Sequence, residues 1–154
     1  TWGLTEAGVL PLDARTSVEG VLDSELPLVL HDALCPMTPP EFIESCVRRA
    51  VEEDVVVVGV RPVTDTVKEL RDGLVGATLD REGLARVASP VVVPAGVVAT
   101  VADLLEDSSR DLVGLVTALR PRTPVELVEA PPEAMRVTGG DDLRVLEALT
   151  RPST

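Results

Sequence analysis

The sequence predicts an α/β fold built on a mostly parallel, twisted sheet, and two kinds of segment carry this prediction. Residues 27–30 and 54–60 are short aliphatic runs without helical periodicity, and the second contains four consecutive valines, which is typical of buried strands. Between them, residues 39–53 place apolar side chains three and four positions apart, as one face of a helix does. A strand, a helix and a second strand in this order favour parallel pairing through a right-handed crossover.

Length and composition limit the classes of protein to which the chain can belong. With 154 residues, and without internal repeats or a low-complexity linker, the chain is expected to form a single domain over residues 1–154. The net charge of −12 argues against a surface that binds nucleic acid or an anionic membrane. There is no leader-like segment and no apolar run of membrane-spanning length, and two cysteines are too few for a disulfide scaffold. We therefore expect a cytoplasmic location.

The first strand is followed by a polar loop, residues 31–38, which we call the crest. His31 and Asp32 follow the strand directly, and in open α/β sheets ligands bind at the carboxyl ends of the strands. Asp32 is therefore the first residue expected to take part in chemistry. Thr38 precedes the next helix, and we expect its side chain to cap that helix, with Glu41 completing a capping box.

A hairpin is expected after the second strand. Residues 62–70 and 74–79 are predicted to form two strands joined by a turn at 71–73, within an arm over 62–86 of the kind that often clasps a partner subunit. Thr138 is expected to cap the last helix of the chain. The other expected elements are strands at about 9–12, 91–93, 125–128 and 135–138, helices at 95–106, 110–119 and 141–149, and a short helix capped by Thr16 or Ser17.

Several motifs match those of one enzyme family in their order and spacing. The matching segments are Val29 to Ala33 with Pro36 (family pattern VLVHDAARP), Arg61 to Lys68 (P-V-x-D-T-x-K), Thr78 to Leu84 (T-x-D-R-x-G-L), Met135 to Leu143 (K-I/V-T-x-x-x-D-L) and, more weakly, Arg15 to Val18 (R-x-x-S-V). Over roughly residues 15–150, the chain resembles the 2-C-methyl-D-erythritol 4-phosphate cytidylyltransferases of the non-mevalonate isoprenoid pathway.

This resemblance implies a Rossmann-like fold of the nucleotide-diphospho-sugar-transferase type and a homodimer held by the 62–86 arm. It also implies transfer of CMP from CTP to methylerythritol phosphate with magnesium. The implied catalytic residues are Asp32, Arg81 and Arg136. Asp32 would lie near the substrate and would be the metal ligand if magnesium binds, while Arg81 would reach across the dimer. Ser17, near the cytosine, and Thr66, in the arm, are the implied substrate-binding residues.

The chain departs from the family pattern at groups on which the chemistry depends. It lacks the Gly-rich, basic loop and the lysine that hold the CTP phosphates, Cys35 replaces an arginine, and Ser89-Pro90-Val91-Val92 replaces T-P-Q-G. Because nucleotidyl transfer depends on positioning and charge neutralisation, we expect a degenerate, catalytically impaired homologue that is inactive as this chain alone. The alternative is an active CTP-dependent nucleotidyltransferase whose N-terminal half comes from a longer precursor or a partner.

The individual residues also have simpler structural interpretations. Asp32 is either a magnesium ligand or a solvated strand end that caps the next turn, and His31 is more often a packing residue than a general base. Arg81 and Arg136 either contact a phosphate, on this or another small phosphorylated ligand, or form surface ion pairs. A zinc site made from the crest residues and Cys46 fits no standard ligand spacing, and Cys46 is expected in the core.

Overall fold

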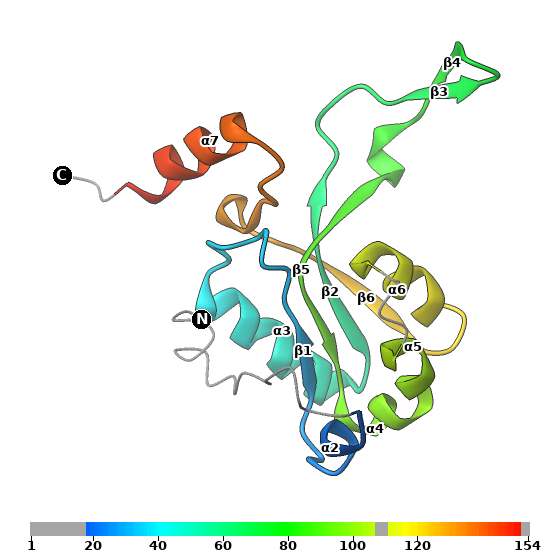
Figure 1. Cartoon of the computed structure of the whole chain (residues 1–154), viewed down its shortest axis with the longest axis vertical. Helices are drawn as coiled ribbons and strands as arrows, with labels where there is room; N and C mark the ends of the chain where they lie inside the picture. The colour runs from blue at the N-terminus through cyan, green and yellow to red at the C-terminus, as the bar shows by residue number, and fades with distance from the viewer. Residues whose placement is uncertain (1–17, 107–110, 152–154) are drawn as a thin grey trace.

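The computed structural model describes residues 18–106 and 111–151, and its centre is a four-stranded sheet (Figure 1). The strands lie in the order β1 (Leu28–Leu30), β5 (Ala85–Val93), β2 (Val56–Pro62) and β6 (Val125–Glu129). β6 pairs with β2 in parallel, whereas β5 is antiparallel to both β1 and β2. Three strands therefore share one direction, which confirms the predicted α/β fold, and β5 is the antiparallel exception.

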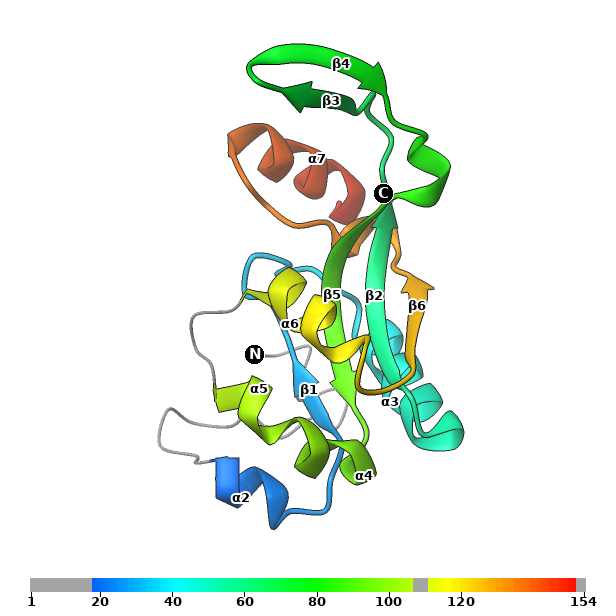
Figure 2. The same cartoon turned by 90° about the vertical axis from the view of Figure 1, so that its right-hand side faces the viewer.

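Helices cover both faces of this sheet (Figure 2). The helix of one face is α3 (Pro40–Glu53). The helices of the other face are α2 (Val18–Leu22), α4 (Ala95–Val98), α5 (Ala102–Glu106) and α6 (Leu112–Leu119). The predicted helix at 95–106 is thus two short helices, because a 3-10 turn at Ala99–Val101 separates α4 from α5.

The valines of β2 show why both faces are covered. Val56 and Val58 belong to the cluster under α4, α5 and α6, whereas Val57 packs with Cys46 and Ala50 of α3. Successive side chains of a strand point to opposite faces, so a run of valines is fully buried only where helices cover both sides. Each buried valine contributes roughly 1.5–3 kcal/mol relative to an exposed one. Cys46 is a core residue, as predicted.

The start of α3 differs from the predicted capping box. The residue that precedes the helix is Pro39, which makes no side-chain cap hydrogen bond. The hydroxyl of Thr38 instead donates to the carbonyl of Cys35 at 2.9 Å, and the Thr38 side chain is buried in the crest. The prediction failed because two prolines separate Thr38 from the first helical amides. Pro40 has no amide hydrogen to cap, so the helix needs one hydrogen-bond acceptor fewer at this end.

The predicted arm is present and forms a sheet of its own. β3 (Lys68–Arg71) and β4 (Leu74–Thr78) pair in antiparallel fashion, and Figure 1 shows the hairpin projecting away from the central sheet. Asp72 and Gly73 form the turn with φ values of 50° and 78°, as a two-residue hairpin turn requires. Residue 62 belongs to β2 rather than to the hairpin, so the first arm strand is shorter than predicted.

The C-terminal segment holds a further correction. Residues 135–138 form no strand, although the amide of Val137 donates to the carbonyl of Leu34 in the crest at 2.7 Å. The last helix, α7 (Gly140–Thr150), is preceded by Gly139 without a side-chain cap. Thr138 does not cap it, because its hydroxyl and its amide both donate to the carboxylate of Asp142, at 2.6 and 2.7 Å. Asp142 of α7 thus accepts hydrogen bonds from Thr138, whereas we expected the Thr138 hydroxyl to accept them from the helix amides.

Some expectations lie outside the described residues, namely the strand at about 9–12 and the cap by Thr16 or Ser17. The strand predicted at 91–93 is longer, because β5 also pairs with β2 through its first residues at the base of the arm. Two 3-10 turns, η1 (Arg81–Gly83) and η3 (Pro132–Ala134), precede β5 and follow β6, respectively. Within residues 18–106 and 111–151, the structure contains no helix that is long and apolar enough to cross a membrane.

Candidate functional site

The candidate site lies at the carboxyl end of β1, where the crest begins. Asp32 is held there by its own loop, since its Oδ1 accepts a hydrogen bond from the amide of Leu34 at 2.9 Å. Its backbone amide donates to the hydroxyl of Ser89 on β5 at 3.2 Å. The interpretation of Asp32 as a side chain that caps the following turn therefore describes one of its two carboxylate oxygens.

The second oxygen of Asp32 is engaged by the C-terminal segment. Oδ2 accepts a hydrogen bond from Nε of Arg136 at 2.7 Å, and this ion pair joins residues 104 positions apart in the sequence. Partial burial raises the pKa of Asp32, but the bonds from Leu34 and Arg136 and the positive charge of Arg136 outweigh it. The pKa of Asp32 is therefore below its ordinary value. The carboxylate stays ionised and faces a guanidinium.

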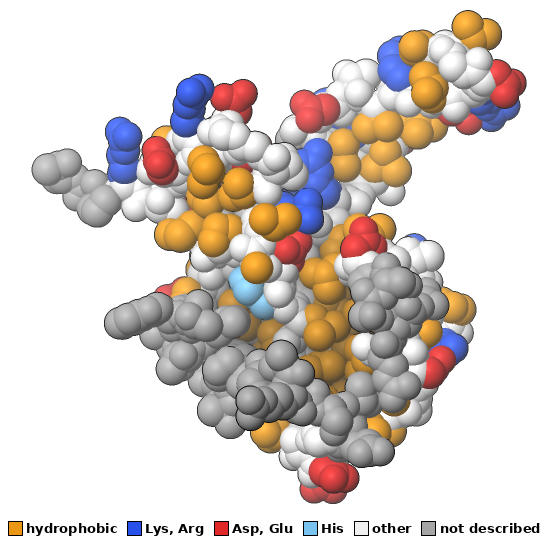
Figure 3. Space-filling view, viewed as in Figure 1, with side chains coloured by type: hydrophobic (Ala, Val, Ile, Leu, Met, Phe, Trp, Pro, Cys, Tyr) orange, Lys and Arg blue, Asp and Glu red, His pale blue; other side chains and the backbone are white. Residues whose placement is uncertain are grey.

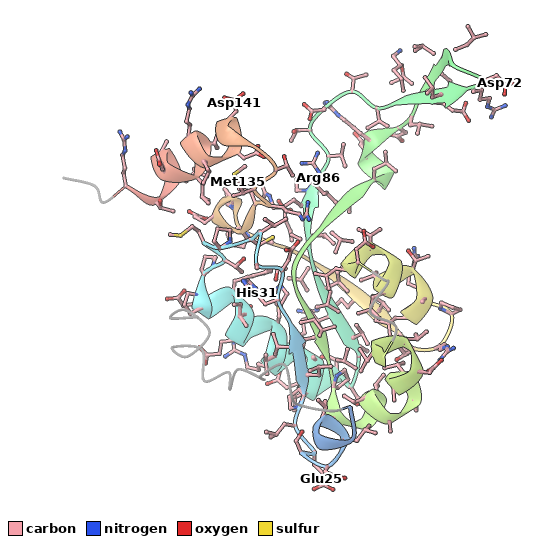
Figure 4. The ribbon with its side chains drawn as sticks, in the orientation of Figure 1. Glu25, His31, Asp72, Arg86, Met135 and Asp141 are labelled. Carbon is pink, nitrogen blue, oxygen red and sulfur yellow. The ribbon has the colours of Figure 1, made fainter. Side chains whose placement is uncertain are left out.

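His31 is tied to the same strand neighbour. Its Nδ1 lies 2.7 Å from Oγ of Ser89, and Figure 4 shows His31 at the end of β1. Burial lowers the pKa of His31, more strongly than the negative charge of Asp32 raises it. Ser89 itself is completely buried. Sequence reasoning did not select Ser89 as a site residue, although its place in a segment resembling T-P-Q-G was a signal for it.

Close packing of β2 against β5 sets the position of Ser89. A Cβ atom at Gly59 would lie 2.8 Å from the carbonyl oxygen of Ser89, so only glycine fits this point of β2 without movement. The pairing register of the two strands shifts here, between Val58 and Val60. The peptide bond between Ser89 and Pro90 is cis. The backbone of Ser89, beneath the crest, is thus packed closely against Gly59 of β2.

Basic side chains gather where the arm joins the body (Figure 3). Arg61 donates to the carbonyl of Ala130 at 2.6 Å and lies 3.6 Å from the carboxylate of Glu129. Arg86 is exposed at the base of the arm, in the region between the arm and the C-terminal segment in Figure 4. The pKa of Asp142 is lowered chiefly by its bonds from Thr138, with Arg86 adding to the effect. This end of the sheet thus combines Asp32 with several guanidinium groups.

A family model for 2-C-methyl-D-erythritol 4-phosphate cytidylyltransferase, IspD, matches residues 15–151 of this sequence. The chain belongs to the IspD family. The enzyme of this name from Frankia casuarinae is 35% identical over 136 residues, which cover 88% of this chain and 50% of the relative. The one from Saccharopolyspora erythraea is 31% identical over 137 residues, covering 88% of this chain and 60% of the relative. The chain therefore spans about half to three-fifths of the length of these two relatives.

Solved structures agree with the family assignment. The crystal structure of the cytidylyltransferase from Thermus thermophilus is 25% identical, with a TM-score of 0.64, and the match covers 86% of this chain and 66% of that one. A 4-diphosphocytidyl-2C-methyl-D-erythritol synthase at 24% identity has a TM-score of 0.67 and supports the fold alone, over 90% of this chain and 63% of that one. The expected Rossmann-like fold and the family resemblance are both confirmed.

Of the four implied IspD site residues that the structure describes, it brings two together. Asp32 and Arg136 are in contact, but Arg81 donates to the carbonyl of Thr64 at 2.6 Å and belongs to the base of the arm. Thr66 is exposed in the arm, and no hydrogen bond of its side chain is found in the part of the chain that the structure describes. Ser17 lies outside the described residues.

Cys35 occupies the IspD position that carries an arginine in the family pattern. Its side chain is completely buried, and burial, with the nearby charge of Asp32, raises its pKa to about 11. The thiol is therefore neutral and supplies no charge to a phosphate. The zinc interpretation finds no support among the described residues, which contain no group of three histidine, cysteine or acidic side chains placed to hold a metal ion.

Magnesium has one candidate ligand here, the carboxylate of Asp32. A single carboxylate together with phosphate oxygens is an ordinary magnesium donor set. Both oxygens of Asp32, however, already accept N–H donors, from Leu34 and Arg136. A cation at Oδ2 would compete with Arg136, so the donor set fits magnesium only if the guanidinium moves from this oxygen.

Proposed function

We propose that this chain is a catalytically impaired IspD homologue whose crest and C-terminal segment keep the methylerythritol phosphate side of the site. The observation that supports this most directly is the Asp32–Arg136 ion pair at the carboxyl end of β1. Ligands of open α/β sheets bind at this end. The exposed guanidinium of Arg86 stands nearby and adds positive charge for a phosphate.

The proposed impairment rests on replacements at two places in the family pattern and on the ion pair that engages Arg136. Cys35 is a buried neutral thiol where the family pattern has an arginine. Val91 and Val92 replace the glutamine and glycine of T-P-Q-G, and both are completely buried in the core, where they offer no hydrogen bond to a nucleotide. Arg136 is already bonded to Asp32. Transfer of a nucleotidyl group depends on neutralising phosphate charge, so these changes weaken the chemistry directly.

A homodimer through the 62–86 arm, in the cytoplasm, is part of the same proposal. Leu70, Leu74 and Val75 of the arm are each at least 70% exposed, an unusual state for large aliphatic side chains on an isolated hairpin. A second copy of the arm would cover them. Arg81, at the base of the arm, would then be carried toward the partner's site rather than its own.

The alternative function is that of an active, CTP- and magnesium-dependent nucleotidyltransferase. In this case the nucleotide-loop half comes from a longer precursor or from a partner chain. The observation in its favour is the length comparison, since the chain covers 50% of the Frankia relative and 60% of the Saccharopolyspora relative. Magnesium would then be held by Asp32 and the phosphates of CTP, with Arg136 released toward the substrate.

Calorimetric titration of the purified chain tests the proposal. We expect methylerythritol phosphate to bind and CTP with magnesium to bind weakly or not at all. Asp32→Asn and Arg136→Ala should both weaken binding of methylerythritol phosphate. Arg144→Ala, which removes an exposed arginine paired with Asp141 on α7, is the matched control and should leave binding unchanged.

Three other outcomes would contradict the proposal. Micromolar binding of CTP with magnesium would favour the alternative function. Binding of inorganic phosphate as tightly as methylerythritol phosphate would indicate a different phosphorylated ligand. If neither methylerythritol phosphate nor CTP with magnesium gives a heat of binding, the proposed substrate is wrong.

A further inference from the structure

Ser89 is the point at which the two candidate crest residues meet the core. Its hydroxyl oxygen lies 3.2 Å from the amide nitrogen of Asp32 and 2.7 Å from Nδ1 of His31. These partners are 57 and 58 positions away in the sequence, so only the tertiary fold brings them together. The residue is 0% exposed, and a substrate therefore cannot touch it. Any influence of Ser89 on a ligand must pass through His31 and Asp32.

The number of hydrogen atoms available at Ser89 determines which groups donate and which accept in this cluster. The amide of Asp32 can only donate, so it uses one lone pair of the Ser89 hydroxyl. The hydroxyl has a single hydrogen, and Nδ1 of His31 is the only acceptor bonded to it among the described residues. If Nδ1 carried a proton, the buried hydroxyl would have no acceptor, which costs free energy. The proton of the neutral ring therefore belongs on Nε2.

The surroundings keep Ser89 from adjusting to another arrangement. The Ser89 carbonyl lies against Gly59, where an added Cβ would be 2.8 Å away, and Pro90 is fully buried beside it. The backbone of Cys35, in the crest, acts on the ring of His31 and raises its pKa, although burial outweighs this effect. Nδ1 of the imidazole is thus held against the core strand β5.

We propose that Ser89 is a positioning residue that fixes His31 in the tautomer with its proton on Nε2 and anchors the backbone of Asp32 beneath the ion pair with Arg136. This inference deepens the proposed function and rests on it for the identity of the ligand. The chain of donors runs from the Asp32 amide to the Ser89 hydroxyl and then to Nδ1 of His31. The crest is thereby held against β5 before any ligand arrives.

Nitrogen-15 NMR of the ring measures this directly, because His31 is the only histidine in the sequence. Labelling of histidine with nitrogen-15 therefore gives ring signals from one residue only, and couplings to the ring carbon-bound protons distinguish Nδ1 from Nε2. Under conditions in which the ring is neutral, we expect one pyridine-type signal from Nδ1 and one pyrrole-type signal from Nε2. A pyrrole-type Nδ1 in the unmodified protein would overturn the proposal, and this result needs no variant to fold.

Variants separate the hydroxyl from other effects. Ser89→Ala should move the two ring nitrogen signals toward each other, as exchange between tautomers does. Ser89→Thr, which restores the threonine of the family pattern, should keep the signals of the unmodified protein. Ser45→Ala is the matched control, since the Ser45 hydroxyl donates to the Phe42 carbonyl within α3. Ring signals in Ser89→Ala that match those of this control would refute the role of Ser89.

Ligand binding gives the second readout. Ser89→Ala should weaken the affinity for methylerythritol phosphate by roughly two- to tenfold, the range that one ordinary hydrogen bond supplies, and Ser89→Thr should restore it. An unmodified protein that does not bind this ligand contradicts the proposed function, while the ring signals still decide whether Ser89 fixes His31. Binding that is equally tight in Ser89→Ala and the unmodified protein overturns the positioning role.

Discussion

An ion pair between Asp32 and Arg136 joins the crest to the segment before α7 at the carboxyl end of β1. Nε of Arg136 lies 2.7 Å from Oδ2 of Asp32, and the neighbouring amide of Val137 bonds to the carbonyl of Leu34 at 2.7 Å. The crest after β1 and the segment before α7 thus hold one another by a charged and a backbone contact. A ligand at the carboxyl end of β1 would meet both segments together.

The Asp32–Arg136 pair predicts a pH-dependent contribution to stability. The folded pKa of Asp32 is below its unfolded value, so the carboxylate stabilises the fold above the unfolded pKa and loses this effect as the pH falls through the folded pKa. Asp32→Asn should therefore lower the free energy of unfolding at neutral pH, with the difference disappearing in acid. Urea denaturation of both proteins between neutral and strongly acidic pH measures this. An equal difference at every pH would contradict the assignment.

The contact between Gly59 and Ser89 predicts a large effect from a small substitution. Gly59→Ala places a methyl group against the Ser89 carbonyl, where backbone atoms must move, and should cost about 1–3 kcal/mol of stability. Gly83→Ala is the control, because a Cβ at Gly83 meets nothing within 4 Å. Chemical denaturation measures both variants. Equal stability of Gly59→Ala and Gly83→Ala would show that β2 and β5 can separate freely at this point.

The two cysteines predict an alkaline loss of stability. Burial raises the pKa of Cys35 and Cys46 to about 11 in the folded protein, from an ordinary 9.0. The unfolded thiols lose their protons first, so the free energy of unfolding should fall as the pH rises between these two values. At pH 8, a thiol reagent should react slowly with the native protein and rapidly in denaturant. Fast reaction of either thiol in the native protein would contradict its burial.

The exposed arm predicts an association that a charge would disrupt. Leu74→Asp combined with Val75→Asp places two carboxylates on β4, where the unmodified side chains are 74% and 71% exposed. Sedimentation should show a dimer for the unmodified protein and a monomer for this double variant. Val113→Asp, which adds a charge at an exposed apolar position of α6, should remain a dimer. A monomeric unmodified protein at high concentration would refute the arm-mediated dimer.

The replacement of an arginine by Cys35 predicts that this chain alone does not transfer CMP. The neutral, buried thiol of Cys35 cannot replace the charge of an arginine on a phosphate. Incubation with CTP, magnesium and methylerythritol phosphate should release no pyrophosphate, with the Thermus thermophilus enzyme as the positive control. Product that disappears in Asp32→Asn would instead establish an active site and favour the alternative function.

Local patterns determined most of the fold from the sequence. The valines of β2, the periodic face of α3 and the turn predicted at 71–73 each act over a few residues. All three elements are present, with bounds shifted by one or two residues and the turn limited to Asp72 and Gly73. Motif resemblance also indicated the family, because Asp32 and Arg136 lie in short segments that can be compared without a structure. The predicted caps at Thr38 and Thr138 were wrong, since a hydroxyl can accept from helix amides or donate to other groups, and local sequence does not rank these partners.

The tertiary structure decided the contacts on which the candidate site depends. Ser89 meets His31 and Asp32 only because β5 runs beside β1, and Arg136 meets Asp32 only because the chain returns to the crest before α7. Such pairings are separated by 57 to 104 positions, and neither periodicity nor propensity acts over that distance. The sequence by itself determined which segments become strands and helices. Packing of those segments determined which polar groups lose water together and must therefore bond to one another.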